Sequence, residues 1–170
     1  MVVQLARANG AAVFATGTAL QAQVIERLGA TAIDFATADS RDYVHTYTAD
    51  VGFDIIFDTV GGATLDQSLS DVRRYTGHVV STLGWGTHNL APLSFRGATY
   101  SGVFALMALL TGEGRAHHAE ILRAATELAE AGKVTPVLDP RHFTLDSAHD
   151  AHAAIQDGSA TGRIVVEIPD

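Results

Sequence analysis

The chain has 170 residues, of which 47% are hydrophobic and 18% are charged, and its formal net charge at pH 7 is −8. This composition is typical of one globular domain with a sizeable core and not of a disordered chain. The negative charge and the absence of any run of Lys or Arg argue against a nucleic-acid partner, because binding to phosphate backbones needs a basic surface.

The residue types also bear on the compartment. The chain has no cysteine, so neither a disulfide framework nor a thiolate metal site can form. The longest apolar stretch, residues 103–110, is far too short to span a bilayer. The first ten residues lack the pattern of a signal peptide. We therefore expect a cytoplasmic protein with no membrane partner.

In chain order, the first half alternates helical periodicity with short apolar runs. The pattern predicts a helix ended by Asn9-Gly10, a strand at 11–16, an amphipathic helix over 20–28 ended by Gly29, a strand at 31–35, a polar helix over 39–49 and a strand at 53–60. Residues 53–60 form the strongest strand prediction. They are apolar on both faces, as expected of a buried parallel strand.

The second half continues this alternation. The pattern predicts a helix with an apolar stripe at 65, 69 and 72, a strand at 77–84, an ambiguous strand or helix start at 98–106, a helix over 117–131 with Gly132 as its C-cap, a helix capped by Asp146 and running to Gln156, and a closing strand at 162–168. Such alternation predicts an α/β protein with a doubly wound parallel sheet. The pattern changes near Lys133, which predicts a domain boundary between residues 1–133 and 134–170.

Glycine recurs at the carboxyl ends of three predicted strands. These ends read Thr16-Gly17-Thr18, then Asp58-Thr59-Val60-Gly61-Gly62, then Leu83-Gly84-Trp85-Gly86. Ligands of doubly wound sheets bind at this edge, and glycine lets a flat ligand approach the backbone closely. Any one of these glycines could simply make a tight turn, but three strand ends that share the feature favour a binding edge.

Four segments carry a resemblance to a known family. They are FDIIFDTVGG (53–62), GHVVSTLGWG (77–86), ELAEAGKVTP (127–136) and FTLDSAHDAHAAIQDGSATGRIVV (143–166). In this order they resemble the C-terminal half of a medium-chain dehydrogenase/reductase, in the zinc-independent, quinone-oxidoreductase-like branch. The resemblance implies a truncated, Rossmann-like dinucleotide-binding domain over 1–133 and a C-terminal segment over 134–170 that in the family returns to the catalytic domain. It also implies hydride transfer from NAD(P)H to quinones, enones or related carbonyl compounds, and a homo-oligomer.

The resemblance also implies where the cofactor would lie. It places the adenosine-ribose end of the cofactor beside Thr16, Gly17 and Thr18, and the nicotinamide end beside Gly102, Val103 and Phe104. The residues expected along the length of the cofactor between these ends are Asp58, Thr59, Val60, Gly61, Leu83, Gly84 and Trp85. Arg163 matches a basic position close to the cofactor. The resemblance assigns no catalytic and no metal-binding residue in this chain.

The choice of cofactor depends on the end of the strand at 11–16. An acid there would hold the ribose hydroxyls of NAD, whereas the neutral Thr18 favours NADP. Phe35 stands where NADP users of this branch often have Tyr, and the Lys that often follows is also missing. Both departures weaken the NADP assignment.

In the resembling family, a first strand, a glycine-rich loop and the catalytic domain precede the segment that matches MVVQLARANG. The later GEGRAH (112–117) lacks the last glycine and is no substitute for the loop. We therefore expect a fold without that strand and loop, with weak or absent NADP binding and no activity in the isolated chain. The strands at 11–16 and 53–60 should then either pair directly or accept a strand from another copy, for which residues 162–168 are a candidate donor.

Several other interpretations are weighed beside these. His149 and His152 share a helix face, but surface histidines without a third ligand rarely bind zinc. Asp58 is expected to be a hydrogen-bonding structural acid more than a general base, and Trp85 could flank a cofactor or only cover the sheet edge. Two further functions stay open: a non-catalytic dimerising module and a methyltransferase.

Overall fold

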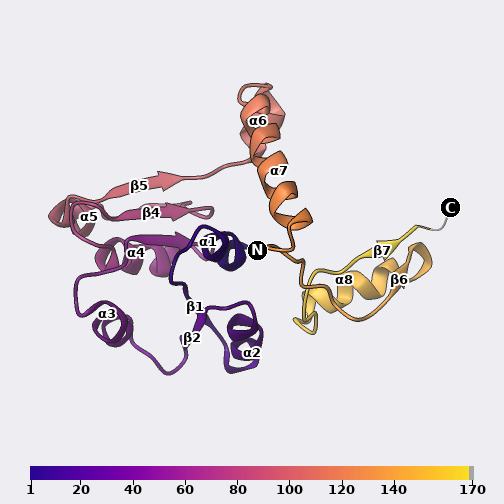
Figure 1. Ribbon diagram of the computed structural model, residues 1–170, viewed down its shortest axis with the longest axis horizontal. Coiled ribbons are helices and arrows are strands. Elements are labelled where there is room, and N and C mark those ends of the chain that lie inside the picture. The colour runs from indigo at the N-terminus through magenta and orange to yellow at the C-terminus, as the bar shows by residue number, and fades with distance from the viewer. Residues whose placement is uncertain (169–170) are drawn as a thin grey trace. The chain divides into compact units, whose positions relative to one another are not determined.

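The computed structural model describes residues 1–168, which form two compact units (Figure 1). One unit is Val13–Leu122. The other combines Met1–Ala12 with the chain from Arg123 onward. The division falls inside helix α7 (Arg115–Glu130), upstream of Lys133. The domain boundary proposed from the sequence stays a prediction.

The larger unit alternates strands and helices, as the periodicity predicts, and it adds a helix over residues 91–96 that the periodicity does not predict. Its elements are β1 (Phe14–Gly17), α2 (Ala19–Arg27), β2 (Thr31–Asp34), α3 (Ser40–Thr48), β3 (Ile55–Asp58), α4 (Gly62–Asp71), β4 (His78–Ser81), α5 (Ala91–Arg96), β5 (Thr99–Gly102), α6 (Leu106–Thr111) and the first part of α7. Every strand pair is parallel, which confirms the predicted α/β class. The ambiguous residues 98–106 contain both a strand, β5, and the start of a helix, α6.

The strands of this unit form two sheets in the described residues, β1-β2 and β3-β4-β5. Of the two alternatives expected for residues 11–16 and 53–60, direct pairing is not found, and the addition of a strand from another copy stays a prediction. Phe14 of β1 instead contacts two rings outside the strands. Its ring lies 4.7 Å from that of Tyr47 in α3 and 5.7 Å from that of Phe53, which precedes β3, between centroids. Contacts of this kind leave one backbone edge of β1 and one of β3 without a ladder partner among residues 1–168.

The burial predicted for residues 53–60 is wrong. Ile55 is 70% exposed and Phe57 is 40% exposed. These two side chains share one face of β3, whereas Ile56 on the opposite face packs against the core. The strand β4 lies between β3 and β5, and its Val79 and Ser81 are fully buried. Apolar composition therefore identified β3 as a strand, but it did not show that only one face of this strand is covered.

The core of the larger unit lies between α4 and the sheet around β4. It consists of Leu65 and Leu69 of α4 with Val72, Val79 and Leu93. The stripe at 65, 69 and 72 is the one that the helical spacing predicts. Burying these side chains fixes the turns at both ends of α4 relative to the sheet.

The smaller unit contains α1 (Val2–Ala8), the end of α7, β6 (Phe143–Thr144), a 3₁₀ turn η1 (Leu145–Ser147), α8 (Ala148–Gln156) and β7 (Val166–Glu167). The helix α1 ends at Asn9, as predicted. The buried Gln4 amide donates to the Thr135 carbonyl at 2.8 Å and accepts from the Thr135 N–H at 2.7 Å. This amide ties α1 to the chain beyond α7.

Two predictions for this unit need correction. Asp146 lies in the turn η1, and Ser147 is the N-cap of α8. The closing strand is confined to Val166–Glu167, which pairs with β6, while Arg163 forms an isolated bridge with Leu138. The stretch is shorter than predicted because its partner β6 has only two residues.

No helix within residues 1–168 combines the length and the apolar character that crossing a membrane requires.

Candidate functional site

Asp58 organises the carboxyl end of β3. Its buried carboxylate accepts hydrogen bonds from the N–H of Val60 at 3.1 Å and of Gly61 at 3.0 Å, and from the Ser81 hydroxyl at 2.6 Å. These bonds fix the turn between β3 and α4 and tie it to β4. A carboxylate engaged in this way has the structural role expected for Asp58.

Gly61 lies where this turn meets the loop after β4. Its φ is +74°, and a Cβ on it would overlap the Leu83 carbonyl. The Leu83 N–H is in turn held by the Ser81 hydroxyl oxygen at 3.1 Å. Glycine is therefore required at 61 both by the backbone conformation and by the packing of the two loops.

Gly84 makes room for a side chain from β5. A Cβ on Gly84 would overlap the Tyr100 hydroxyl, and Gly102 lies against the same hydroxyl, 3.4 Å from where its own Cβ would be. The Tyr100 side chain thus packs across the ends of β4 and β5 because both positions lack a side chain.

A pocket of about 100 Å³ opens at the carboxyl ends of β4 and β5. Its lining consists of Ser81, Thr82, Gly84, Trp85, Tyr100, Gly102, Val103 and Phe104. The rings of Trp85 and Phe104 meet edge to face, with centroids 5.4 Å apart. The structure therefore brings together five of the predicted cofactor residues: Gly84, Trp85, Gly102, Val103 and Phe104.

A second pocket, of about 210 Å³, lies on the other side of Gly84 and Tyr100, which line both pockets. Its other lining residues are Leu65, Leu69, Gly86, His88 and Leu90. This second pocket is mostly apolar and borders the core. His88 is the histidine among the residues that line this second pocket.

Thr16, Gly17 and Thr18 end β1, in the separate β1-β2 sheet. Gly17 is buried, and a Cβ on it would lie 2.7 Å from Cδ1 of Ile25. The Thr18 N–H donates to Oε1 of Gln21 at 3.0 Å and so helps to begin α2. No strand pairing among the described residues connects this end to the pocket at β4 and β5.

The other predicted residues lie in two places. Thr59 and Val60 form the turn that Asp58 holds, and Val60 is 67% exposed. Arg163 belongs to the smaller unit. There its N–H donates to the Val137 carbonyl at 2.7 Å, and its carbonyl accepts from the Asp139 N–H at 3.0 Å.

The glycines at the strand ends fall into two groups according to what lies beside them. The space beside Gly17, Gly61 and Gly84 is filled by the protein's own atoms. Gly62 and Gly86 instead face open space, with φ of +53° and +111°. These two were not assigned to the cofactor, although the doubled GG and the GWG motif place them at the same edge. They are the glycines beside which a ligand has room.

A family model described as zinc-binding dehydrogenase matches residues 28–166. The chain belongs to this zinc-binding dehydrogenase family. Two curated relatives are each 29% identical over 98% of the chain: a 2-methylene-furan-3-one reductase from Solanum lycopersicum and a chloroplastic NADPH-dependent alkenal/one oxidoreductase from Arabidopsis thaliana. The chain spans 36% of the length of each.

Solved structures agree with this membership. An alcohol dehydrogenase superfamily protein from Novosphingobium aromaticivorans is 47% identical, with a TM-score of 0.91 over 98% of this chain and 51% of that one. The Escherichia coli quinone oxidoreductase complexed with NADPH is 24% identical, with a TM-score of 0.78 over 98% of this chain and 52% of that one, and so shares the fold. The resemblance stated from the sequence motifs is confirmed.

The family description names zinc, and the residues that the structure describes do not fit a zinc site. Within residues 1–168 no group of three or more His, Cys, Asp or Glu side chains is arranged to hold a metal ion, whereas protein zinc sites use three or four such ligands. His149 lies beside Asp150, at 3.1 Å, without a third ligand. No step of the chemistry is therefore assigned to zinc in this chain.

Proposed function

We propose that this chain forms the cofactor-binding part of an NADPH-dependent oxidoreductase that reduces enone, alkenal or quinone-type carbonyl compounds. The names of the two curated relatives support the reaction class. The observation that carries the proposal is the pocket at the carboxyl ends of β4 and β5, lined by Trp85 and Phe104. In doubly wound sheets this edge is where ligands bind.

The residues of the chain fit a flat, uncharged ring at this edge. The aromatic pair offers faces against which such a ring can stack. The pocket is rigid at its base, because the Thr82 N–H donates to the Asp58 carbonyl at 3.1 Å and the Val103 N–H donates to the Ser81 carbonyl at 2.8 Å. When bound, the cofactor would supply the hydride, while these residues orient its ring.

We further propose that NADPH is preferred over NADH and that the 170 residues alone bind it weakly and do not turn over substrate. Neutral Thr16 and Thr18 flank the last residue of β1, so this strand end itself carries no carboxylate, and the acid at the same edge is Asp34 of β2, opposite Gly17. The sequence contains no G-x-G-x-x-G turn to hold the pyrophosphate at a helix N-terminus.

Calorimetric titration of the chain with NADPH and with NADH tests the proposal. We expect weak binding that favours NADPH by about tenfold, equivalent to about 1.4 kcal/mol. Gly84→Asp should abolish it, because the new side chain would displace Tyr100 from the pocket. Ala119→Asp adds the same charge at an exposed position of α7 and should leave binding unchanged.

Three results would contradict parts of this proposal. Tight, NADH-selective binding would overturn the cofactor preference. Turnover of a quinone or enone by the chain, lost in Gly84→Asp, would overturn the expected inactivity. Binding of neither nucleotide by a folded, self-associating chain would favour the interaction module, and binding of S-adenosylmethionine would favour the methyltransferase.

A further inference from the structure

Trp85 is held in place by a histidine three residues further along the chain. The side chain of His88 is only 12% exposed. Its Nδ1 lies 2.8 Å from Oδ1 of Asp66 in α4, and its Nε2 lies 3.3 Å from the Trp85 carbonyl oxygen. One imidazole thus connects the loop after β4 to α4.

Both partners of this imidazole accept hydrogen bonds. A carboxylate and a backbone carbonyl have no proton to give, and a neutral imidazole carries only one N–H. Both contacts are therefore satisfied as hydrogen bonds only by the imidazolium form, in which each ring nitrogen donates.

The surrounding charges favour the same form. The hydrogen bond to the Asp66 carboxylate raises the pKa of His88 above its usual value, and the negative charge of Asp58 adds to this. The other titratable group on the same pocket wall is the phenol of Tyr100. Two of the three neighbouring groups are thus carboxylates that favour the cation.

The backbone around Trp85 has a glycine on each side. Gly84 precedes it, and Gly86 follows it with a φ of +111° and open space beside it. Leu83 is held by Ser81, and the Ala91 N–H is held by Oδ1 of Asn89 at 3.0 Å. Between these two anchors, the His88 contact attaches the Trp85 carbonyl to the helix α4.

We propose that protonated His88 is a positioning residue that holds Trp85 against Phe104 at the mouth of the β4–β5 pocket, and that deprotonation of His88 releases Trp85. The link to cofactor affinity rests on the proposed function, but the link to the position of Trp85 does not. The hydrogen bonds from protonated His88 to Asp66 and to the Trp85 carbonyl are both present at acidic pH. They are lost as the pH rises through the raised pKa of His88.

The chain contains a single tryptophan, so one indole N–H resonance reports on Trp85. Recording that resonance from about pH 5 to about pH 9 covers the range in which histidine titrates. We expect one transition, with a midpoint above 6.5, the ordinary pKa of histidine. His88→Asn should abolish the transition, and Asp66→Asn should move its midpoint to lower pH.

A matched control is available at the end of α3. There Nδ1 of His45 lies 2.8 Å from Oδ2 of Asp50, and this contact also raises the pKa of His45. His45→Asn removes an equivalent pair outside the Trp85 loop and should leave the indole transition unchanged.

The outcomes separate this inference from the proposed function. A transition that persists in a folded His88→Asn variant would overturn the inference, as would its absence in the wild type. If His88→Asn does not fold, an unshifted midpoint in Asp66→Asn overturns it instead. NADPH binding that is absent while the indole transition is intact contradicts the proposed function only. Where NADPH binds, its affinity should fall as the pH rises through the same midpoint.

Discussion

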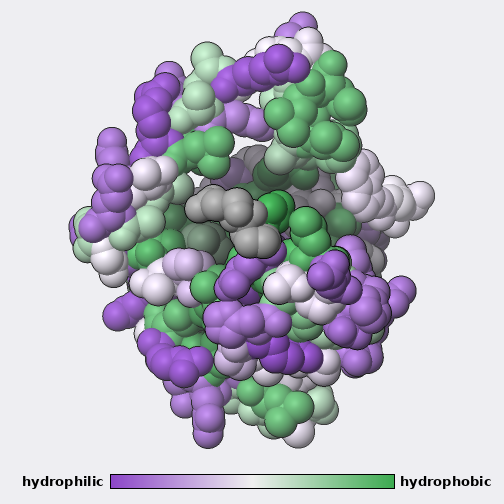
Figure 2. All heavy atoms as spheres, turned by 90° about the vertical axis from the view of Figure 1, so that its right-hand side faces the viewer, coloured by the Kyte–Doolittle hydropathy of each residue, from purple (hydrophilic) through white to green (hydrophobic). Residues whose placement is uncertain are grey.

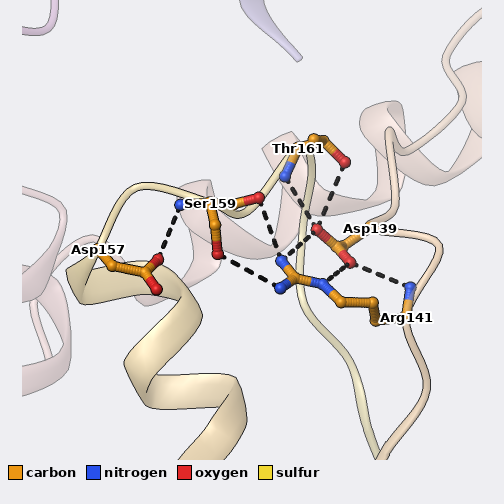
Figure 3. Close-up of polar contacts among 5 residues, drawn as sticks. All are labelled: Asp139, Arg141, Asp157, Ser159 and Thr161. Atoms are coloured by element: carbon orange, nitrogen blue, oxygen red, sulfur yellow. Dashed lines mark hydrogen bonds and ion pairs between the residues drawn. The ribbon is translucent and has the colours of Figure 1, made fainter.

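At the scale of single residues, the Asp139 carboxylate lies at the centre of a cluster of hydrogen bonds in the smaller unit (Figure 3). Its side chain is only 1% exposed. Arg141 donates to it from Nε at 2.8 Å and from Nη2 at 3.0 Å, and the Thr161 N–H donates at 2.9 Å. Arg141 also reaches the carbonyl of Ser159 at 3.2 Å. This cluster joins the loop before β6 to the chain after α8.

The cluster makes the stability of the smaller unit depend on pH. The hydrogen bonds from Arg141 hold the pKa of Asp139 well below its ordinary value of 3.8. Because the pKa is lower in the folded state, the stabilisation is complete above about pH 4 and is lost as the pH falls toward the lowered value. Asp139→Asn should therefore lower the melting temperature at pH 7 and flatten its dependence on pH below about 4.

Thermal melts of the wild type and of Asp139→Asn across the acidic range provide the measurement. Asp146→Asn, at an exposed position of η1, is the control and should follow the wild-type curve. Equal acid sensitivity of the wild type and Asp139→Asn would show that this carboxylate does not contribute as described.

At the scale of elements, the ends of β4 and β5 pack closely because Gly84 has no side chain and Tyr100 occupies the space beside it. The Tyr100 hydroxyl occupies the space that a Cβ on Gly84 would need, while the rest of the ring lies no closer than 3.4 Å to that point. The two pockets on either side of this contact therefore depend on one glycine and one hydroxyl.

A double-mutant cycle tests this fit. Gly84→Ala should destabilise the fold by about 1–3 kcal/mol, as overpacking does in other cores. Tyr100→Phe removes the overlapping oxygen, so the double variant should recover most of that loss, whereas Tyr100→Phe alone should have a small effect. Denaturant unfolding of the four proteins measures the coupling. Strictly additive losses would mean that Gly84 and Tyr100 are not in contact.

At the scale of the whole molecule, apolar side chains remain at the surface. Figure 2 shows hydrophobic residues among hydrophilic ones on one face. Within the described residues, β1 pairs only with β2 and β3 pairs only with β4, and Ile55 of β3 is 70% exposed. An apolar edge strand with free backbone groups is a site for pairing with another chain.

We expect the chain to self-associate at micromolar concentration through the free edge of β3. Ile55→Lys should shift light scattering toward the monomer, because a lysine on an edge strand opposes strand addition. Leu20→Lys introduces the same charge on α2 at a residue that is 92% exposed, and it should not change the association. A strictly monomeric wild type with a cooperative melt would contradict this prediction.

Local pattern predicted most of the helices and strands, the apolar stripe of α4 and the family, but it missed the helix α5 and the two-residue strand β6. The features that it predicted are encoded by neighbouring residues, since a helical stripe repeats every three or four positions and a strand end is marked by its own turn. The motifs that identify the family are likewise contiguous stretches. The residues that line the pocket at the ends of β4 and β5 also lie in contiguous strand-end stretches, and their role toward a cofactor stays a prediction.

Only the tertiary structure decided the remaining features. Exposure of β3 depends on which of its two faces is packed against the core, and the glycines at 17, 61 and 84 depend on which other atoms fill their space. Gln4 meets Thr135, His88 meets Asp66, and Asp139 meets Thr161 across long separations in the chain. No local periodicity records such partners, because each contact is created when separate elements pack together.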